Sequence, residues 1–260
     1  MNKENQLKFI NENYELHCTH SSKRKIRHDI FSNIETELQA YLLGIYASDG
    51  SADMKRKTIR LQLQSEDKDI VNLFKNTISP NARTFVKQPY KTTGRNGMII
   101  NGNGSYGVDI SSSIIVNDLI KIGFPYNKSY YNIKIPNINK DLVRHFIRGY
   151  FDGDGCITGW LSIEKGKKDR VRYSFDICSK QKAILYDIID FFNENDININ
   201  LNYIKRDDMY RIKTSSKLEI KKIYNLLYND SNFYLNRKYN KFNYYVNTEI
   251  SQLIADHCNA

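Results

Sequence analysis

The chain carries one ten-residue pattern twice, as Tyr41-Leu42-Leu43-Gly44-Ile45-Tyr46-Ala47-Ser48-Asp49-Gly50 and as Phe146-Ile147-Arg148-Gly149-Tyr150-Phe151-Asp152-Gly153-Asp154-Gly155. Each copy is an apolar run that is compatible with a helix, and each ends in Asp-Gly. Small residues recur four positions apart, at Gly44 and Ser48 and again at Gly149 and Gly153. Residues at that spacing share one helix face, so the pattern predicts two helices whose backbones pack closely.

Asp49 and Asp154 each follow the small face of their helix by one residue. Two helices packed side by side would therefore bring two carboxylates together at their C-terminal ends. The helix dipole already makes that end negative, which is unfavourable for acidic side chains. A divalent cation shared by the two carboxylates would compensate, and hard oxygen ligands favour magnesium over zinc.

The repeated pattern resembles the motif of the LAGLIDADG family, most of whose members are homing endonucleases. Phe151 to Gly155 is a close match, whereas the first copy keeps only its last acidic residue and the following glycine. The family's metal ligand is that last acidic residue, so the resemblance carries the role to Asp49 and Asp154. It places Gly50 and Gly155 in the same metal site.

Three motif positions depart from the pattern that the resemblance implies. Asp152 has Ala47 as its counterpart and therefore does not take the metal role. Tyr46 and Arg148 are bulkier than the family consensus, which puts the tightness of helix packing in question.

The resemblance covers roughly residues 30–245 and implies an α+β fold. Two pseudo-symmetric αββαββα halves would form saddle-shaped antiparallel sheets on DNA, with the two motif helices at the interface. We expect residues 31–136 to form the first half and 137–245 the second. Residues 1–30 would be a basic arm that touches phosphate or a solvated lead-in, and residues 246–260 a helical tail.

Composition independently favours a nucleic-acid partner. The 260 residues carry a formal net charge of +10, with a pI near 9.2, so a polyanion is the natural ligand. No run approaches 18 apolar residues and the N-terminus is polar, which predicts no membrane segment and a location in the cytoplasm or an organellar matrix. The cysteines lack CxxC spacing and are expected to be free thiols. They are Cys18, Cys156, Cys178 and Cys258.

Alternation predicts strands over 58–64, 171–177 and 209–214, each with one apolar face. Their opposite faces carry side chains that include the types that pair with base edges in the major groove, although ordinary half-exposed strands also show this pattern. The candidate DNA-contacting residues are Arg60, Gln62 and Gln64 in the first half, and Arg172, Ser174, Asp176, Arg211 and Lys213 in the second.

Serines and lysines supply the remaining candidate residues. A capping box at Ser32–Glu35 is expected to start the first motif helix, and Ser65 and Ser179 to cap the helices after the strands. These two serines and Gln64 are also candidates for ordering water near the metals. Lys128 lies in a Gly-aromatic-x-x-x-Lys-Ser segment that resembles the family's, and Lys238 occupies its place in the second half. Both are candidate catalytic residues, the alternative being ordinary surface lysines.

These observations predict a monomeric, metal-dependent endodeoxyribonuclease, a homing endonuclease that cuts both strands of a long asymmetric duplex. Mg2+ would be the cofactor, with Mn2+ able to substitute. The gene would lie in an intron or stand free as a mobile element. Two alternatives stay open: a group I intron maturase that binds intron RNA, and a DNA-binding regulator that has lost hydrolysis. A regulator needs no paired carboxylates, which favours the nuclease over it.

Overall fold

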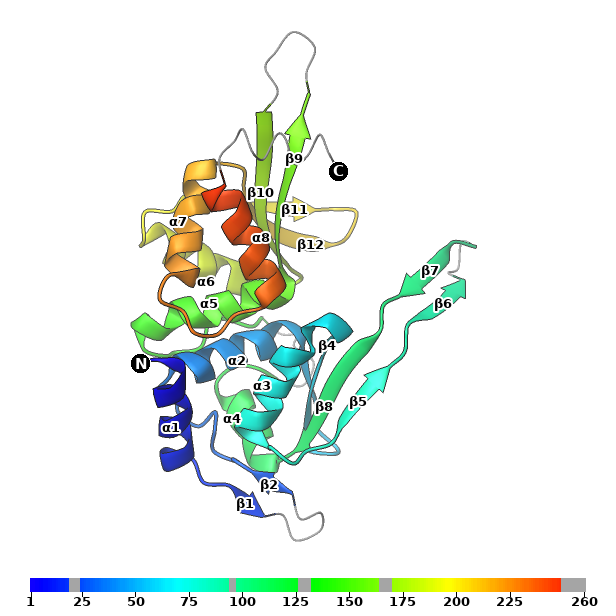
Figure 1. Ribbon diagram of the computed structural model, residues 1–260, viewed down its shortest axis with the longest axis vertical. Helices are drawn as coiled ribbons and strands as arrows, with labels where there is room; N and C mark the ends of the chain where they lie inside the picture. Colours follow the sequence, from blue (N-terminus) through cyan, green and yellow to red (C-terminus); the bar gives the residue numbers. More distant parts are fainter. Residues whose placement is uncertain (19–23, 94–96, 126–131, 164–169, 249–260) are drawn as a thin grey trace.

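The computed structural model describes residues 1–18, 24–93, 97–125, 132–163 and 170–248. Two helices, α2 and α5, lie side by side at the centre, with one half of the chain on each side of them (Figure 1). The predicted order of helix, two strands, helix, two strands and helix is confirmed in both halves, and the first half inserts a β-ribbon.

The first half has these elements: α2 (Glu37–Asp49), β3 (Gly50–Asp53), β4 (Thr58–Gln64), the 3-10 turn η1 (Ser65–Asp67), α3 (Lys68–Ile78), β5 (Thr84–Lys87), the ribbon strands β6 (Tyr90–Thr93) and β7 (Ile99–Gly102), β8 (Ser105–Ser111) and α4 (Ser113–Lys121). The second half has α5 (Lys140–Asp154), β9 (Gly155–Ser162), β10 (Arg170–Ser179), α6 (Lys182–Asn193), β11 (Asn200–Ile204), β12 (Met209–Thr214), α7 (Lys217–Tyr228) and α8 (Asn236–Asn247). The expected boundary at residue 245 therefore falls inside α8.

The two four-stranded sheets have the same topology. Their strand orders are β3-β4-β8-β5 and β9-β10-β12-β11, so each half places its strands in the order first, second, fourth, third. All pairings in both sheets are antiparallel. Each motif helix leads directly into the edge strand of its own sheet, since Gly50 and Gly155 are both helix C-caps and first strand residues. The ends of the motif helices are therefore fixed to the sheets.

Helix starts differ from the sequence prediction at three places. The capping box of α2 is formed by Thr36 and Gln39, because the Ser32 hydroxyl instead donates to Asp118 at 2.5 Å. Ser65 begins a 3-10 turn and does not cap α3. Ser179 accepts from the backbone N–H of Gln181 at 3.0 Å, one residue before α6 begins, so it forms a short turn and is not the N-cap.

Residues before α2 pack against the first half. Helix α1 (Lys3–Asn13) buries Ile10, and strands β1 (His17–Cys18) and β2 (Lys25–Ile26) pair as a short ribbon. Arg27 is buried and donates to the carbonyls of Tyr14 and Thr77 at 3.0 and 2.7 Å. Arg27, within the segment expected to be a basic arm, therefore has a structural role.

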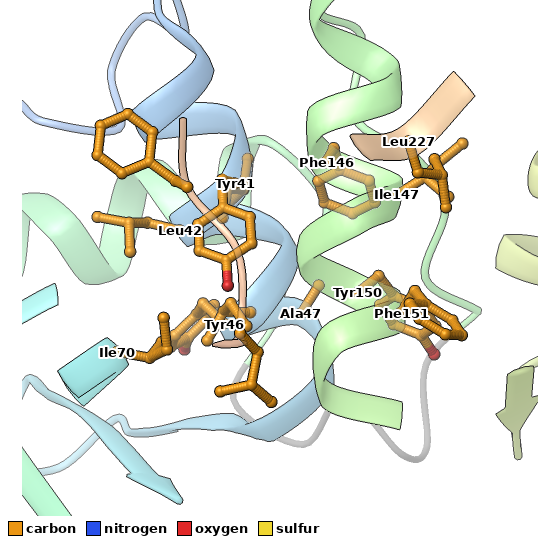
Figure 2. Packing of buried hydrophobic residues seen from close by; sticks show 14 of the residues in the cluster. Tyr41, Leu42, Tyr46, Ala47, Ile70, Phe146, Ile147, Tyr150, Phe151 and Leu227 are labelled. Carbon is orange, nitrogen blue, oxygen red and sulfur yellow. The ribbon is translucent and has the colours of Figure 1, made fainter. Parts of the chain in front are cut away.

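The core runs continuously through the motif helices. Figure 2 shows Tyr41, Leu42 and Ala47 on α2 beside Phe146, Ile147 and Phe151 on α5. All six are nearly completely buried, and together they join the hydrophobic interiors of the two halves. Among the described residues, no helix has the length and apolarity needed to cross a membrane. Of the helical tail expected at 246–260, residues 249–260 lie outside the described residues.

Candidate active site

The small faces of α2 and α5 meet as the sequence predicts. A methyl group added to Gly44 would lie 2.9 Å from the backbone nitrogen of Tyr150 and 3.0 Å from the Cα of Gly149. One added to Gly149 would lie 2.9 Å from the nitrogen of Ile45. Ordinary Cβ contacts are longer than this, so only glycine allows the two backbones to approach so closely.

The bulky Arg148 does not loosen the contact at the glycines, because its side chain extends to Glu37 at the beginning of α2 and to carbonyls of the second half. It donates to Glu37 Oε1 and to the Phe233 carbonyl, both at 2.7 Å, and to the Leu227 carbonyl at 2.8 Å. Its guanidinium is fully buried, so these hydrogen bonds replace its lost hydration. Arg148 thereby joins the beginning of α2 to the second half.

Asp49 and Asp154 are the last residues of their helices. The Asp49 carboxylate and the Ser48 hydroxyl occupy the space directly over Gly153, the residue before Asp154. Burial raises the pKa of Tyr150, and the Asp154 and Asp49 carboxylates raise it further, so both charges act on one phenol. The predicted meeting of the two helix ends is therefore present.

Lys238 lies beside the same helix end. Its ammonium donates to the carbonyls of Phe151, Gly153 and Gly155 at 2.8, 3.1 and 2.6 Å. These bonds use all three of its N–H groups and neutralise the negative end of the α5 dipole. Burial lowers the pKa of Lys238, which the Asp152 carboxylate opposes. The hydrogen bonds give Lys238 a capping role, and its predicted catalytic role stays a prediction.

Each of the two aspartates opens into its own cavity. Asp49 lies in a cavity of about 280 Å3 whose polar lining includes Gln62, Gln64, Asp67 and Arg237. Asp154 lies in one of about 410 Å3 lined by Cys178, Ser179, Lys180 and Gln181 among others. The candidate water-ordering residues Gln64 and Ser179 are thus beside the aspartates, whereas Ser65 does not line either cavity.

Arg237 is a candidate residue that the sequence reasoning missed. Its Nε and one terminal nitrogen donate to the two carboxylate oxygens of Asp67, each at 2.7 Å. Asp67 is only 5% exposed and belongs to the first half, while Arg237 belongs to α8 in the second. The signal was the pair Asn127-Lys128, which matches Asn236-Arg237 better than it matches Lys238. Lys128 itself lies outside the described residues.

The buried Asp152, whose counterpart in the first copy is Ala47, has a structural role. It accepts from the Tyr228 hydroxyl at 2.7 Å, the Tyr41 hydroxyl at 2.9 Å and the backbone N–H of Leu235 at 2.7 Å. Burial raises the pKa of Asp152, and these hydrogen bonds lower it. Asp152 therefore holds α2, α7 and the segment before Arg237 together.

On the outward face of the first sheet, two of the predicted polar residues are hydrogen-bonded to side chains of the neighbouring strand. Arg60 donates from two nitrogens to the Asp109 carboxylate, both at 2.7 Å, and the Gln62 amide donates to Ser105 at 2.9 Å. Gln64 is exposed at the end of β4. These residues are on one face, as the alternation predicts.

The outward face of the second sheet is less uniform. Arg172 is exposed and donates to the Ser162 hydroxyl at 3.0 Å. The strand register places Asp176 beside Lys213 on β12, and Arg211 lies two residues before Lys213 on the same strand, opposite Cys178. Ser174, expected to be accessible, is only 4% exposed. Its role as a base contact would need the side chains around it to move, and the role stays a prediction.

No family sequence model and no curated protein sequence matches the chain. Solved structures do match. The meganuclease I-SmaMI bound to uncleavable DNA aligns with a TM-score of 0.57 at 13% identity, over 87% of this chain and 92% of that one. The LAGLIDADG homing endonuclease I-GzeII in complex with its DNA target aligns with a TM-score of 0.54 at 16% identity, over 85% and 91%. The homing endonuclease I-LtrWI bound to target DNA aligns with a TM-score of 0.52 at 14% identity, over 86% of this chain and 91% of that one.

These alignments span both halves of the chain and nearly the full length of each matching structure. Identity is low, so the likeness concerns the fold, and it agrees with the resemblance drawn from the repeated motif. The chain has the two-half fold of the single-chain LAGLIDADG homing endonucleases.

Proposed function

We propose that this chain is a site-specific DNA endonuclease that hydrolyses both strands of a long, asymmetric duplex. The observation that carries the proposal is the pair of aspartates at the ends of two glycine-packed helices, each opening into its own cavity. Two sites in one chain suit the two strands of a duplex, and a monomer is then sufficient. The structural neighbours named above were determined with DNA, which supports the choice of substrate.

The residues at the helix ends fit a divalent metal of the hard type. Carboxylates and backbone carbonyls are the oxygen donors that Mg2+ prefers, and Mn2+ accepts the same donors. Among the described residues, no group of three or more His, Cys, Asp or Glu side chains is arranged to hold a metal, so water and phosphate oxygens would complete the coordination. Such a metal would neutralise charge on the reacting phosphate and lower the pKa of water.

Asp49 and Asp154 would hold the metal in this proposal. Of the two glycines in the predicted metal site, Gly155 already gives its carbonyl to Lys238 at 2.6 Å, which favours the carboxylates as the main ligands. Arg237 lies within the Asp49 cavity and would donate to a phosphate oxygen there. Gln62 and Gln64, in the same cavity, would orient water by hydrogen bonding.

Outward from the cavities, the sheet faces would contact the duplex. The two faces carry different residues at equivalent places, so they would read different half-sites, which is why the target would be asymmetric. The buried Nε of Arg211 has no hydrogen-bond partner among the described residues, so a change of side-chain rotamer on binding would let it donate to a phosphate or base acceptor.

The test is cleavage of a duplex selected from a randomised library by the wild-type protein. Cutting should require Mg2+ or Mn2+ and stop with a chelator. Asp49→Asn and Asp154→Asn should each abolish double-strand cleavage while binding is largely retained. Glu194→Gln is a matched control, because Glu194 is an exposed carboxylate that pairs with Lys140 at the opposite end of α5.

Full cutting by either aspartate variant in magnesium would overturn the metal-site assignment. Binding without any cutting in either metal would favour the regulator, whose fold needs no paired carboxylates. Selective binding of structured intron RNA over duplex DNA would favour the maturase.

A further inference from the structure

The residue at the N-cap of the helix that follows the second strand differs between the two halves. Asp67 is the N-cap of α3, and Gln181 is the N-cap of α6. Each comes two residues after the equivalent serine, Ser65 or Ser179. Asp67 lines the Asp49 cavity, and Gln181 lines the Asp154 cavity. The two positions are therefore equivalent both in the chain and in the site, but only one is charged.

Helix capping does not explain Asp67. Its side chain makes no capping hydrogen bond to α3, although aspartate at an N-cap commonly accepts from the first turn. Both of its oxygens are instead given to Arg237, at 2.7 Å each. The sequence places a buried carboxylate here, and the fold directs it across the interface to the other half.

The geometry of this pair fixes the guanidinium. A bidentate contact sets the plane of an arginine side chain as well as its distance, and it removes rotamers that a free side chain would occupy. The Arg237 side chain is 43% exposed, whereas that of Asp67 is 5% exposed. The buried carboxylate is thus a fixed support for a cation that remains accessible from the cavity. An arginine has five N–H donors, so three remain after this pairing.

We propose that Asp67 is a positioning residue for the Asp49 site, holding Arg237 of the second half against the first half's cavity. The inference rests on the proposed endonuclease function. It means that the site of one strand is assembled from both halves by an ion pair, whereas the equivalent position of the other site carries the neutral Gln181. The two strands are then cut by sites of different electrostatics.

The experiment uses Asp67→Gln, which gives the first half the residue of the second. The substrate is a supercoiled plasmid carrying the duplex selected by wild-type cleavage, with each strand's cutting rate followed separately in Mg2+. We expect one strand to be cut about 10–100-fold more slowly, because displacement of a catalytic group by about 1 Å costs rates of that order. The other strand should stay within about two-fold, so nicked circles should accumulate, with KM unchanged.

A double variant separates positioning from simple stabilisation. If Asp67 acts through Arg237, adding Asp67→Gln to Arg237→Gln should change the slow strand's rate no further. Asp118→Asn is the matched control. Asp118 is 6% exposed and pairs with Lys121 and Ser32 within the first half, so its loss should leave the ratio of the two strand rates unchanged. Asp67→Glu should restore part of the lost rate.

Equal slowing of both strands, or additive losses in the double variant, would overturn the inference and leave the proposed function intact. Wild-type rates for both strands in Asp67→Gln would do the same. If that variant does not fold, Asp67→Asn serves for the same comparison. Failure of the wild-type protein to cut any duplex of the library with either metal would overturn the proposed function, and the inference with it.

Discussion

The Asp49 and Asp154 cavities occupy equivalent places at the ends of the motif helices, yet the groups that surround them differ. Around the Asp49 cavity and on the first sheet, arginines are paired with carboxylates: Arg237 of the second half with Asp67, and Arg60 with Asp109. Around the Asp154 cavity, Gln181 takes the place of Asp67. The backbone of this protein is therefore nearly symmetric while its charge distribution is not.

This difference shows which features the fold requires and which are available for recognition. Strand order, helix order and the Asp-Gly helix ends are the same in both halves. Exposed ion pairs such as Arg60–Asp109 contribute little to stability, so they are free to differ between the halves. We therefore expect changes at the symmetric positions to affect the whole protein, and changes at the asymmetric ones to affect one half-site.

The largest effect should come from the glycine contact between α2 and α5, where the halves are most alike. Gly44→Val and Gly149→Val should each destabilise the fold by at least about 4 kcal/mol, because the obstructing atoms belong to backbone and cannot move aside. Urea unfolding and cleavage should report equal losses for the two variants. Leu218→Val, at a 63% exposed helix position, is the control. A mild effect at only one glycine would mean that the interface is not symmetric.

These symmetric features are also the ones that sequence could predict. The repeated Asp-Gly pattern located both helix ends, and alternation placed β4 and β12 at the observed residues. Local patterns failed where a distant residue decides the outcome. Ser32 has the sequence of a capping residue, but Asp118 on α4 takes its hydroxyl.

The asymmetric features were harder to predict for the same reason. Lys238 and Arg237 are adjacent in the sequence, and either fits the place of Lys128. Their roles separate only when Asp67 and the carbonyls of α5 are brought near them by folding. Burial of Ser174 on an outward strand face likewise depends on neighbouring strands that alternation does not describe.

A salt series tests whether both halves engage one duplex together. If about 6–10 phosphates are neutralised, log K should fall against log salt with a slope near −5 to −9. The affinity for the duplex would then drop by several orders of magnitude as the salt concentration rises from about 50 to about 200 mM. Sedimentation should show one protein per duplex. A nearly flat series, or a smallest active complex of two proteins per duplex, would mean that the halves of one chain do not act as a pair.

Acid should weaken the contact at the opposite ends of the motif helices, where α2 meets α5 through charge. Burial and the neighbouring Arg148 together lower the pKa of His145 to about 3, although Glu37 opposes them. The folded state therefore binds fewer protons than the unfolded state between about pH 3 and 6.5. Stability should be full above about pH 6.5 and fall by about 3–5 kcal/mol as the pH drops toward 3.

Urea unfolding at pH 7 and pH 4 measures this loss, and His145→Asn should remove most of it. Glu37 remains in that variant. Although burial opposes it, Arg148 lowers the pKa of Glu37, so this carboxylate adds a loss of the same sign at lower pH. An unchanged pH dependence in His145→Asn would show that the imidazole is not the group being titrated.

The smallest effect should be confined to single base pairs, and it compares the two sheet faces directly. Arg60→Ala and Arg172→Ala should each relax discrimination at one position of their own half-site by about 1–3 kcal/mol, the range for a bidentate base contact.

Asp109→Asn should also relax discrimination in the first half-site, because the Asp109 carboxylate holds Arg60 through two hydrogen bonds of 2.7 Å. Ser162→Ala removes a single hydroxyl acceptor of Arg172, at 3.0 Å, and should have less effect in the second half-site. Cleavage of a library with single substitutions in the target measures all four variants. If Arg60→Ala instead weakened cleavage of all sequences equally, Arg60 would be a phosphate contact. An equal response to Asp109→Asn and Ser162→Ala would show that the Arg60–Asp109 ion pair does not position Arg60 for base recognition.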